Sequence, residues 1–183
     1  MVKICLCLFA IAIVGAMAIT QEERTAMLNL HTELRNALLA GTVAGQPRAR
    51  SMSTLVWDSG LEATAQKRVD RCSLDHESHE DRIPAGQANN KLYKHISQNV
   101  ALAHRDTPLV DVAQHWWNEH TAFNYDRRYC TGGRPCMTYV TMAWAATTRV
   151  GCAYKNCEEK LVVCNYALGR SKATKNSPPY DKA

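Results

Sequence analysis

The stretch "TYVTMAWAATTRVGCA", Thr138 to Ala153, contains two runs rich in β-branched and aromatic residues. Residues of these types favour strands, so the sequence predicts strands over 139–144 and 149–154. A third run of this kind, "LVVCNY", predicts a strand over 161–166. This part of the chain is therefore expected to contribute paired strands to a sheet.

Three stretches upstream have the apolar spacing of helices. A capping box, Thr20 to Glu23, opens the first, and its apolar residues recur at helical spacing until Gly41. A second capping box, Ser59 to Glu62, opens a helix whose apolar stripe ends at Cys72. Thr107-Pro108 begins the third. Helices that precede paired strands predict an α+β fold built in layers.

The first 18 residues have the pattern of a secretory signal peptide. Lys3 precedes an apolar run that ends in the small-x-small cleavage site Ala16-Met17-Ala18, and the run is shorter than the ~20 residues that span a membrane. Residues 19–170 have the length of one domain, in which the polar stretch 73–95 is expected to form a long loop. Residues 171–183 contain too few apolar side chains to fold alone, which predicts a flexible C-terminal tail. We therefore expect a secreted, extracellular protein that is not an integral membrane protein.

The chain has eight cysteines, of which Cys5 and Cys7 lie in the signal, so six remain and predict three disulfides. Spacing favours a local disulfide between Cys130 and Cys136 and leaves the pairing of the other four open. The cysteines are scattered without a CxxC pair, which argues against zinc bound by thiolates. The net charge of +5, which becomes +4 without Lys3, is spread along the chain and predicts no nucleic-acid partner.

Seven motifs occur in a fixed order along almost the whole mature chain: "HTELRNALLAG" (31–41), "LVWDSGLEATAQKRVDRC" (55–72), "CSLDH" (72–76), "SQNVA" (97–101), "WWNEHTAFNY" (116–125), "YVTMAWAATTRVGCA" (139–153) and "VVCNYALG" (162–169). Together they resemble the CAP (SCP/TAPS) superfamily, and most of all a secreted venom-allergen-like protein of a parasitic helminth. The resemblance implies a three-layer α-β-α sandwich with a central antiparallel sheet. It also implies the disulfides Cys72–Cys157 and Cys152–Cys164 beside Cys130–Cys136.

The resemblance further implies a cleft in which two histidines and two glutamates can hold a divalent metal. His76 and Glu119 match two of these positions, whereas Gln98 and Thr138 replace a glutamate and a histidine. Neutral oxygens are weak ligands, so we expect a degenerate cleft with no metal and no cofactor. His76 and Glu119 are then expected to hydrogen-bond across the cleft.

Two features of the sequence argue against catalytic activity. The six mature cysteines are expected to be oxidised, and the chain has neither a GxSxG nor an HExxH motif. His79 and His120 lie near the cleft motifs and are possible replacement ligands, but histidines on polar loops more often stay on the surface. We therefore predict that the protein is not an enzyme.

Members of the CAP superfamily bind sterols and fatty acids, and the resemblance therefore implies lipid partners. An aromatic loop would form a flat sterol contact, unless its rings simply pack on the sheet; it contains Phe123, Tyr125 and Tyr129. A channel for an acyl chain would lie between the first and third helices, unless these side chains are ordinary core; its residues are Leu30, Leu34, Val112 and Trp116.

The sequence thus predicts a secreted carrier of sterol or fatty acid that acts at the host–parasite interface. The alternative is an immunomodulatory ligand of a host protein or receptor that carries no physiological lipid.

Overall fold

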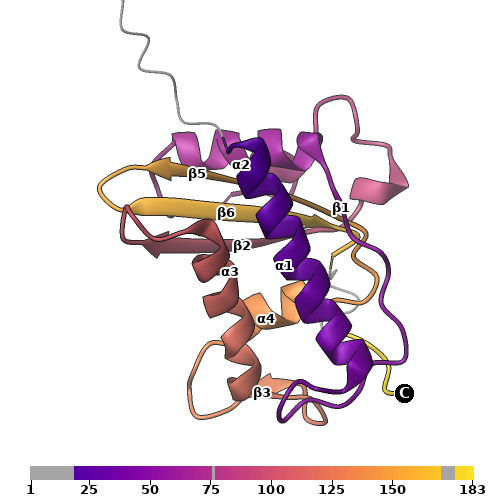
Figure 1. Cartoon of the computed structure of the whole chain (residues 1–183). Coiled ribbons are helices and arrows are strands. Elements are labelled where there is room, and N and C mark those ends of the chain that lie inside the picture. The colour runs from indigo at the N-terminus through magenta and orange to yellow at the C-terminus, as the bar shows by residue number, and fades with distance from the viewer. Residues whose placement is uncertain (1–18, 76, 170–175) are drawn as a thin grey trace, which may run out of the picture.

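A four-stranded sheet forms the middle layer of the molecule (Figure 1). The computed structural model describes residues 19–75, 77–169 and 176–183, so the expected signal peptide lies outside the described residues. The strands lie in the order β1-β5-β6-β2, and their bounds are β1 Val56–Trp57, β2 Ile96–Ala103, β5 Arg149–Asn156 and β6 Lys160–Ala167. Strands β2 and β5 both pair with β6 in antiparallel register, whereas the short β1 pairs with β5 in parallel.

Helices cover both faces of this sheet, as the three-layer prediction requires. Helix α2 (Ser59–Asp70) packs on β5 and β6 from one side. Helices α1 (Gln21–Ala40), α3 (Leu109–Asn118) and α4 (Met137–Met142) pack together on the other side (Figure 1). The predicted α-β-α sandwich is confirmed.

The first helix begins and ends at the predicted residues. Thr20 is the N-cap of α1: its hydroxyl accepts from Glu23 N–H, and the Glu23 carboxylate accepts from Thr20 N–H in return. Gly41 follows the last turn with a φ of 74°, a backbone conformation that glycine adopts without strain.

The N-cap of the second helix lies one residue before the predicted one. Asp58, not Ser59, is the N-cap of α2, because the Asp58 carboxylate accepts from Leu61 N–H. The carboxylate of Glu62 turns away from the cap and accepts two hydrogen bonds from Arg24 of α1 and one from the Trp57 indole. The predicted capping box is therefore wrong, and Glu62 instead joins α2 to α1.

The strand predicted over 139–144 is wrong, since residues 137–142 form helix α4. This short helix buries Tyr139, Val140 and Met142 against α3 and the core, and a disulfide holds Cys136 just before it. Packing thus overrides the strand preference of the β-branched and aromatic residues. The strands predicted over 149–154 and 161–166 are confirmed as β5, which extends two residues further at its C-terminal end, and β6, which is one residue longer at each end.

The remaining segments contain only short elements among the described residues. Loop 73–95 contains two 3-10 turns, η1 (Glu80–Arg82) and η2 (Lys91–Tyr93). After α3, the 3-10 turn η3 (Glu119–Ala122) leads into a small hairpin of β3 (Phe123–Asn124) and β4 (Tyr129–Cys130).

Three disulfides join the cysteines in the expected pairs. Cys72–Cys157 ties the end of α2 to the turn between β5 and β6, Cys152–Cys164 links those two strands, and Cys130–Cys136 closes a loop after the hairpin. Disulfides of this kind persist in oxidising compartments, which agrees with an extracellular protein.

The end of the chain lies against the domain, which differs from the expected flexible tail. In the described part of this tail, Tyr180 is only 3% exposed, and its hydroxyl donates to the Pro47 carbonyl. Ala49 and Lys182 form an antiparallel bridge. The segment 176–183 has too few apolar residues to fold alone, but one buried tyrosine and an available backbone edge are enough to attach it.

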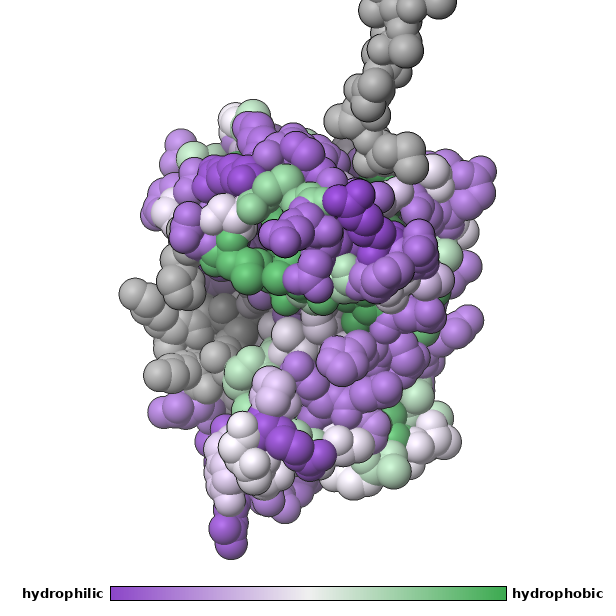
Figure 2. Space-filling model, turned by 90° about the vertical axis from the view of Figure 1, so that its left-hand side faces the viewer, coloured by the Kyte–Doolittle hydropathy of each residue, from purple (hydrophilic) through white to green (hydrophobic). Residues whose placement is uncertain are grey.

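The face of the molecule seen in Figure 2 is mostly hydrophilic, with one band of hydrophobic side chains across its upper half. Among the described residues, no helix is long and apolar enough to cross a bilayer.

Candidate functional site

Glu119 and Thr138, two of the four predicted cleft residues, lie in direct contact. Thr138 N–H, in the first turn of α4, donates to the Glu119 carboxylate at 3.1 Å. The Thr138 hydroxyl donates to the Trp116 carbonyl at 3.4 Å. Glu119 directly follows α3, so these bonds fasten the start of α4 to the end of α3. One carboxylate oxygen of Glu119 and the hydroxyl of Thr138 thus already have partners within the protein.

A chain of hydrogen bonds runs from Thr138 through the sheet to α1. The Asn99 amide donates to the Thr138 carbonyl at 3.0 Å and hydrogen-bonds the Tyr166 phenol. Tyr166 lies 3.0 Å from Nε2 of His31, and Nδ1 of His31 lies 2.7 Å from the Met27 carbonyl. A carbonyl can only accept, so Nδ1 carries the proton and Nε2 accepts from the phenol. Buried polar groups therefore connect the sheet with α1 and α4.

His31 is neutral in this chain. It is 1% exposed, and burial lowers its pKa from 6.5 to about 4, with the charge of Arg35 acting in the same direction and the Met27 bond opposing it. Burial also raises the pKa of Tyr166, so its hydroxyl remains a donor to His31.

Arg35 lies one turn beyond His31 and binds the segment that links α4 to β5. Burial lowers the pKa of Arg35 to about 10, which leaves the guanidinium charged at neutral pH. Its two terminal nitrogens donate five hydrogen bonds of 2.8–3.3 Å to backbone carbonyls. The acceptors are Ser53, Met142, Trp144, Ala145 and Thr147. A charge this deeply buried is tolerated because carbonyl dipoles surround it.

Sequence reasoning missed this internal network. His31 and Arg35 are polar, but they lie in the buried stripe of α1, between Met27 and Leu38. The signal was present in the spacing, since residues 27, 31, 35 and 38 follow one another at helical intervals.

Gln98, the third cleft position, points to the other face of the sheet. Successive side chains of a strand alternate, so Asn99 faces α4 whereas Gln98 faces α2. The Gln98 amide donates at 2.8 Å to both the Glu77 carboxylate and the Asn165 side chain. Glu77 is 8% exposed and lies 3.8 Å from the Arg82 guanidinium. Gln98 therefore belongs to a separate polar cluster with Glu77.

The described residues do not fit the metal that the family cleft can hold. Thr138 and Gln98 use their polar groups within the protein, and His76 lies outside the described residues. Over residues 19–75, 77–169 and 176–183, no three histidine, cysteine, aspartate or glutamate side chains are grouped as metal ligands.

The aromatic loop contributes mainly to the core. Phe123 is 6% exposed and packs against Tyr139, with ring centroids 5.8 Å apart. Tyr125 is 9% exposed, and its hydroxyl donates to the Tyr180 carbonyl. Tyr129 at the start of β4 is 44% exposed. Of the three predicted sterol contacts, only Tyr129 presents its ring to solvent.

The predicted acyl-chain residues lie on α1 and α3, two helices that pack against each other along a contact that we call the seam. Val112 and Trp116 are buried, with 5% and 2% exposure. Leu30 and Leu34 are half-buried and pack against the same core. They flank the buried stripe of α1 on one side, and Leu39, on the other side, borders loop 52–55.

The sandwich, its disulfide pairs and the altered cleft define a class of disulfide-stabilised, secreted-type α+β domains. Residues 28–166 match the model of the cysteine-rich secretory protein (CAP) family, and the chain belongs to that family.

Two curated relatives show the range of this similarity. GLIPR1-like protein 1 of Mus musculus is 33% identical over 148 residues, which are 78% of this chain and 58% of the mouse protein. Scoloptoxin SSD43 of Scolopendra dehaani is 30% identical over 155 residues, which are 80% of this chain and 70% of that protein. The match thus spans little more than half of the mouse relative. Neither name is that of an enzyme.

Among solved structures, the venom allergen-like protein 4 of Schistosoma mansoni is similar over 90% of this chain and 97% of its own, with 29% identity and a TM-score of 0.73. The structure of Na-ASP-1 matches 92% of this chain and 44% of its own, with a TM-score of 0.74 and 22% identity, and supports the fold alone. The expected likeness to a helminth venom-allergen-like protein is confirmed.

Proposed function

We propose that the protein is a secreted carrier of fatty acid or sterol at the host–parasite interface, with a degenerate metal cleft and no catalytic activity. One observation supports it above the others: Leu30 and Leu34 of α1 are half-buried and pack against a core cluster that includes Val112 and Trp116 of α3. Partly covered apolar surface is what an acyl chain needs when it enters between two helices.

The free energy gained by burying an acyl chain is large enough to support binding. Burying a methylene group contributes about 0.8 kcal/mol, so ten methylenes contribute about 8 kcal/mol before the cost of ordering the chain and the surrounding side chains. Thr138 N–H donates to the Glu119 carboxylate, so the binding that we propose needs no ion in the cleft. Lipid uptake should therefore be independent of divalent metal.

The test is saturable binding of radiolabelled palmitate to the mature protein, with and without EDTA. Leu34→Gln, at the seam, should weaken binding at least tenfold. Leu39→Gln is the matched control, since Leu39 is also a half-buried leucine of α1 but lies on the opposite flank. Binding that ignores EDTA and is lost only in the Leu34 variant supports the proposal. If palmitate does not bind, or both variants bind alike, the seam is not a lipid site.

The test of sterol binding should use Tyr129→Ala rather than Phe123→Ala. Phe123→Ala would remove a buried ring and cost about 3–5 kcal/mol of stability, so a loss of binding there would be ambiguous. Tyr129→Ala removes an exposed ring, and Met137→Ala, a 40% exposed side chain, is its control. A fully delipidated protein that binds neither cholesterol nor palmitate, but keeps its activity on host cells, would favour a ligand of a host protein or receptor.

A further inference from the structure

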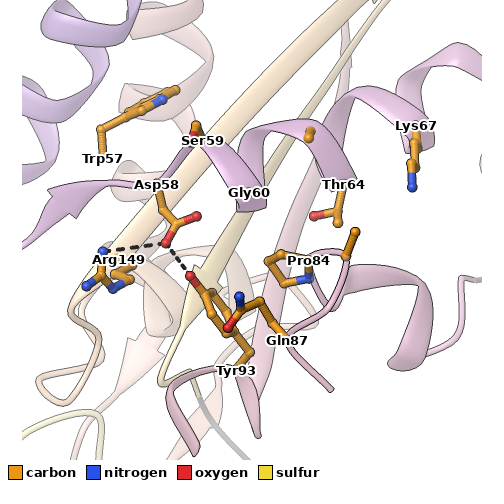
Figure 3. Close-up of a pocket in the computed structure, with 12 residues that line it drawn as sticks. Trp57, Asp58, Ser59, Gly60, Thr64, Lys67, Pro84, Gln87, Tyr93 and Arg149 are labelled. Atoms are coloured by element: carbon orange, nitrogen blue, oxygen red, sulfur yellow. Dashed lines mark hydrogen bonds and ion pairs between the residues drawn. The ribbon is translucent and has the colours of Figure 1, made fainter. Parts of the chain in front are cut away.

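A pocket of about 460 Å³ lies at the N-terminal end of α2 (Figure 3). Helix α2 covers the opposite face of the sheet from α3, which Glu119 directly follows, and α4, which carries Thr138. Its walls come from the end of β1, the first half of α2, the start of β5 and loop 84–93. Small-molecule sites commonly have volumes of about 300–1,000 Å³. The pocket is therefore large enough for a ligand of one or two rings.

Asp58 forms the floor of this pocket, and it is 6% exposed. Its carboxylate accepts from Leu61 N–H at 2.9 Å and from the Tyr93 hydroxyl at 2.7 Å, and it lies 3.6 Å from the Arg149 guanidinium (Figure 3). These three partners occupy three of the roughly four acceptor sites of the Asp58 carboxylate. A ligand in the pocket would find the negative charge of Asp58 already compensated.

The polar groups that remain available in the pocket are donors. Arg149 has five N–H groups and directs its described ion pair to Asp58 alone. Within the described part of the chain, the Lys67 ammonium makes no hydrogen bond or ion pair, and the pocket includes it. The Gln87 oxygen accepts from Asn90 at 2.8 Å, which leaves the Gln87 NH2 group to donate. Two cations and an amide donor, beside a carboxylate that is already paired, favour an anion.

The two cations lie at opposite ends of the pocket. Arg149 is beside Asp58 at the start of α2, whereas Lys67 follows Ser59 by eight residues, about 12 Å along the helix. Figure 3 shows Pro84 between these two ends, and Trp57 at the same end as Arg149 but on the other side of Asp58. The Trp57 indole N–H is bonded to Glu62 at 2.7 Å, so the ring is held in place as an apolar wall.

We propose that this pocket binds a short dianion, a sugar unit that carries sulfate, phosphate or carboxylate groups toward both ends. Arg149 would bind one acidic group and Lys67 the other, with the sugar ring against Trp57 and Pro84. This site is independent of the lipid seam, because α1 and α3 cover the other face of the sheet.

Isothermal titration calorimetry of the mature protein at fixed ionic strength tests the proposal with three probes. A sulfated heparin disaccharide and fructose 1,6-bisphosphate supply the two sources of paired acidic groups, and inorganic sulfate supplies a single one. At least one dianion should bind with one-to-one stoichiometry and at least tenfold more tightly than sulfate. Failure of both dianions to bind, or equal binding of sulfate, overturns the proposal.

Two variants locate the site. Lys67→Gln and Arg149→Gln should each weaken binding of the dianion at least fivefold. Arg134→Gln removes one exposed charge next to the hairpin, away from α2, and should change binding less than twofold. Lys67 is exposed and has no described partner, so Lys67→Gln tests binding without disturbing the fold. An equal loss in all three variants would mean attraction by net charge and would overturn the proposal.

Discussion

Protonation of His31 should couple the stability of the fold to pH. His31 is 1% exposed and its Nε2 accepts from Tyr166, so a second proton would have to replace that bond. Burial lowers the pKa of His31 from 6.5 to about 4. The unfolded chain therefore takes up the proton first as the pH falls. The stability that is present above pH 6.5 is lost progressively as the pH falls through the folded-state pKa.

The magnitude follows from the two pKa values. At pH 5.0 this single histidine lowers the free energy of unfolding by about 2 kcal/mol. Below pH 4 the decrease approaches roughly 3 kcal/mol. For a domain whose total stability is on the order of 5–15 kcal/mol, this is a large fraction.

Urea unfolding at pH 7.5 and 5.0, with the disulfides intact, measures this linkage. His31→Gln should be less stable than wild type at pH 7.5, because it loses the bonds to Met27 and Tyr166. On acidification it should lose about 2 kcal/mol less than wild type does. Burial also lowers the pKa of His95 and His120, but both remain in the variant and cancel in the comparison. His115→Gln, an exposed position on α3, is the control. Equal losses in wild type and His31→Gln would refute the reasoning.

Three further changes test other parts of the structure. Replacing Cys72 and Cys157 together by serine opens a link across 85 residues and should cost about 4–5 kcal/mol, against about 2 kcal/mol for the six-residue disulfide next to the hairpin, as chemical denaturation can compare. Gln98→Glu would bring two carboxylates together on the α2 face. It should destabilise the protein by roughly 1–3 kcal/mol at pH 7.5, with partial recovery near pH 4.5, visible as a smaller gap in Tm. Tyr180→Ala should cost about 3 kcal/mol and expose the C-terminal segment to protease, whereas a freely moving tail would show no change in stability.

The parts of the fold that the sequence predicts well are those in which local and tertiary preferences agree. The first helix has a complete capping box and a terminal glycine, and the last two strands are β-branched runs of strand length that the core buries on both faces. Helix α4 is the counterexample. Its six residues have strand-forming side chains, but contact with α3 and the disulfide at Cys136 hold them in a helix. Such contacts come from residues distant in sequence and leave no local pattern.

The candidate site shows the same limit. The family positions identify Glu119 and Thr138, and the structure brings these two together. Gln98 is bonded instead to Glu77, which lies in an irregular loop with no periodicity. The burial of His31 and Arg35 also goes against the general rule that charged and polar side chains of a helix face water. Hydrogen bonds to partners on other elements, such as Tyr166 for His31 and the Met142 and Trp144 carbonyls for Arg35, offset the cost of that burial.

The order of the strands has a consequence for synthesis of the chain. Among the described residues, β1 pairs only with β5 and β2 pairs only with β6, so both early strands need partners from the last third of the sequence. Until then Cys72 has no native partner, although Cys130 and Cys136 emerge before Cys157 does. Correct disulfide formation therefore depends on how much of the chain has been synthesised. We expect nascent chains stopped before residue 157 to form mispaired disulfides that a thiol–disulfide isomerase must reverse. Completed chains should instead form all their native disulfides together. Mass spectrometry of stalled and released chains would separate the two populations.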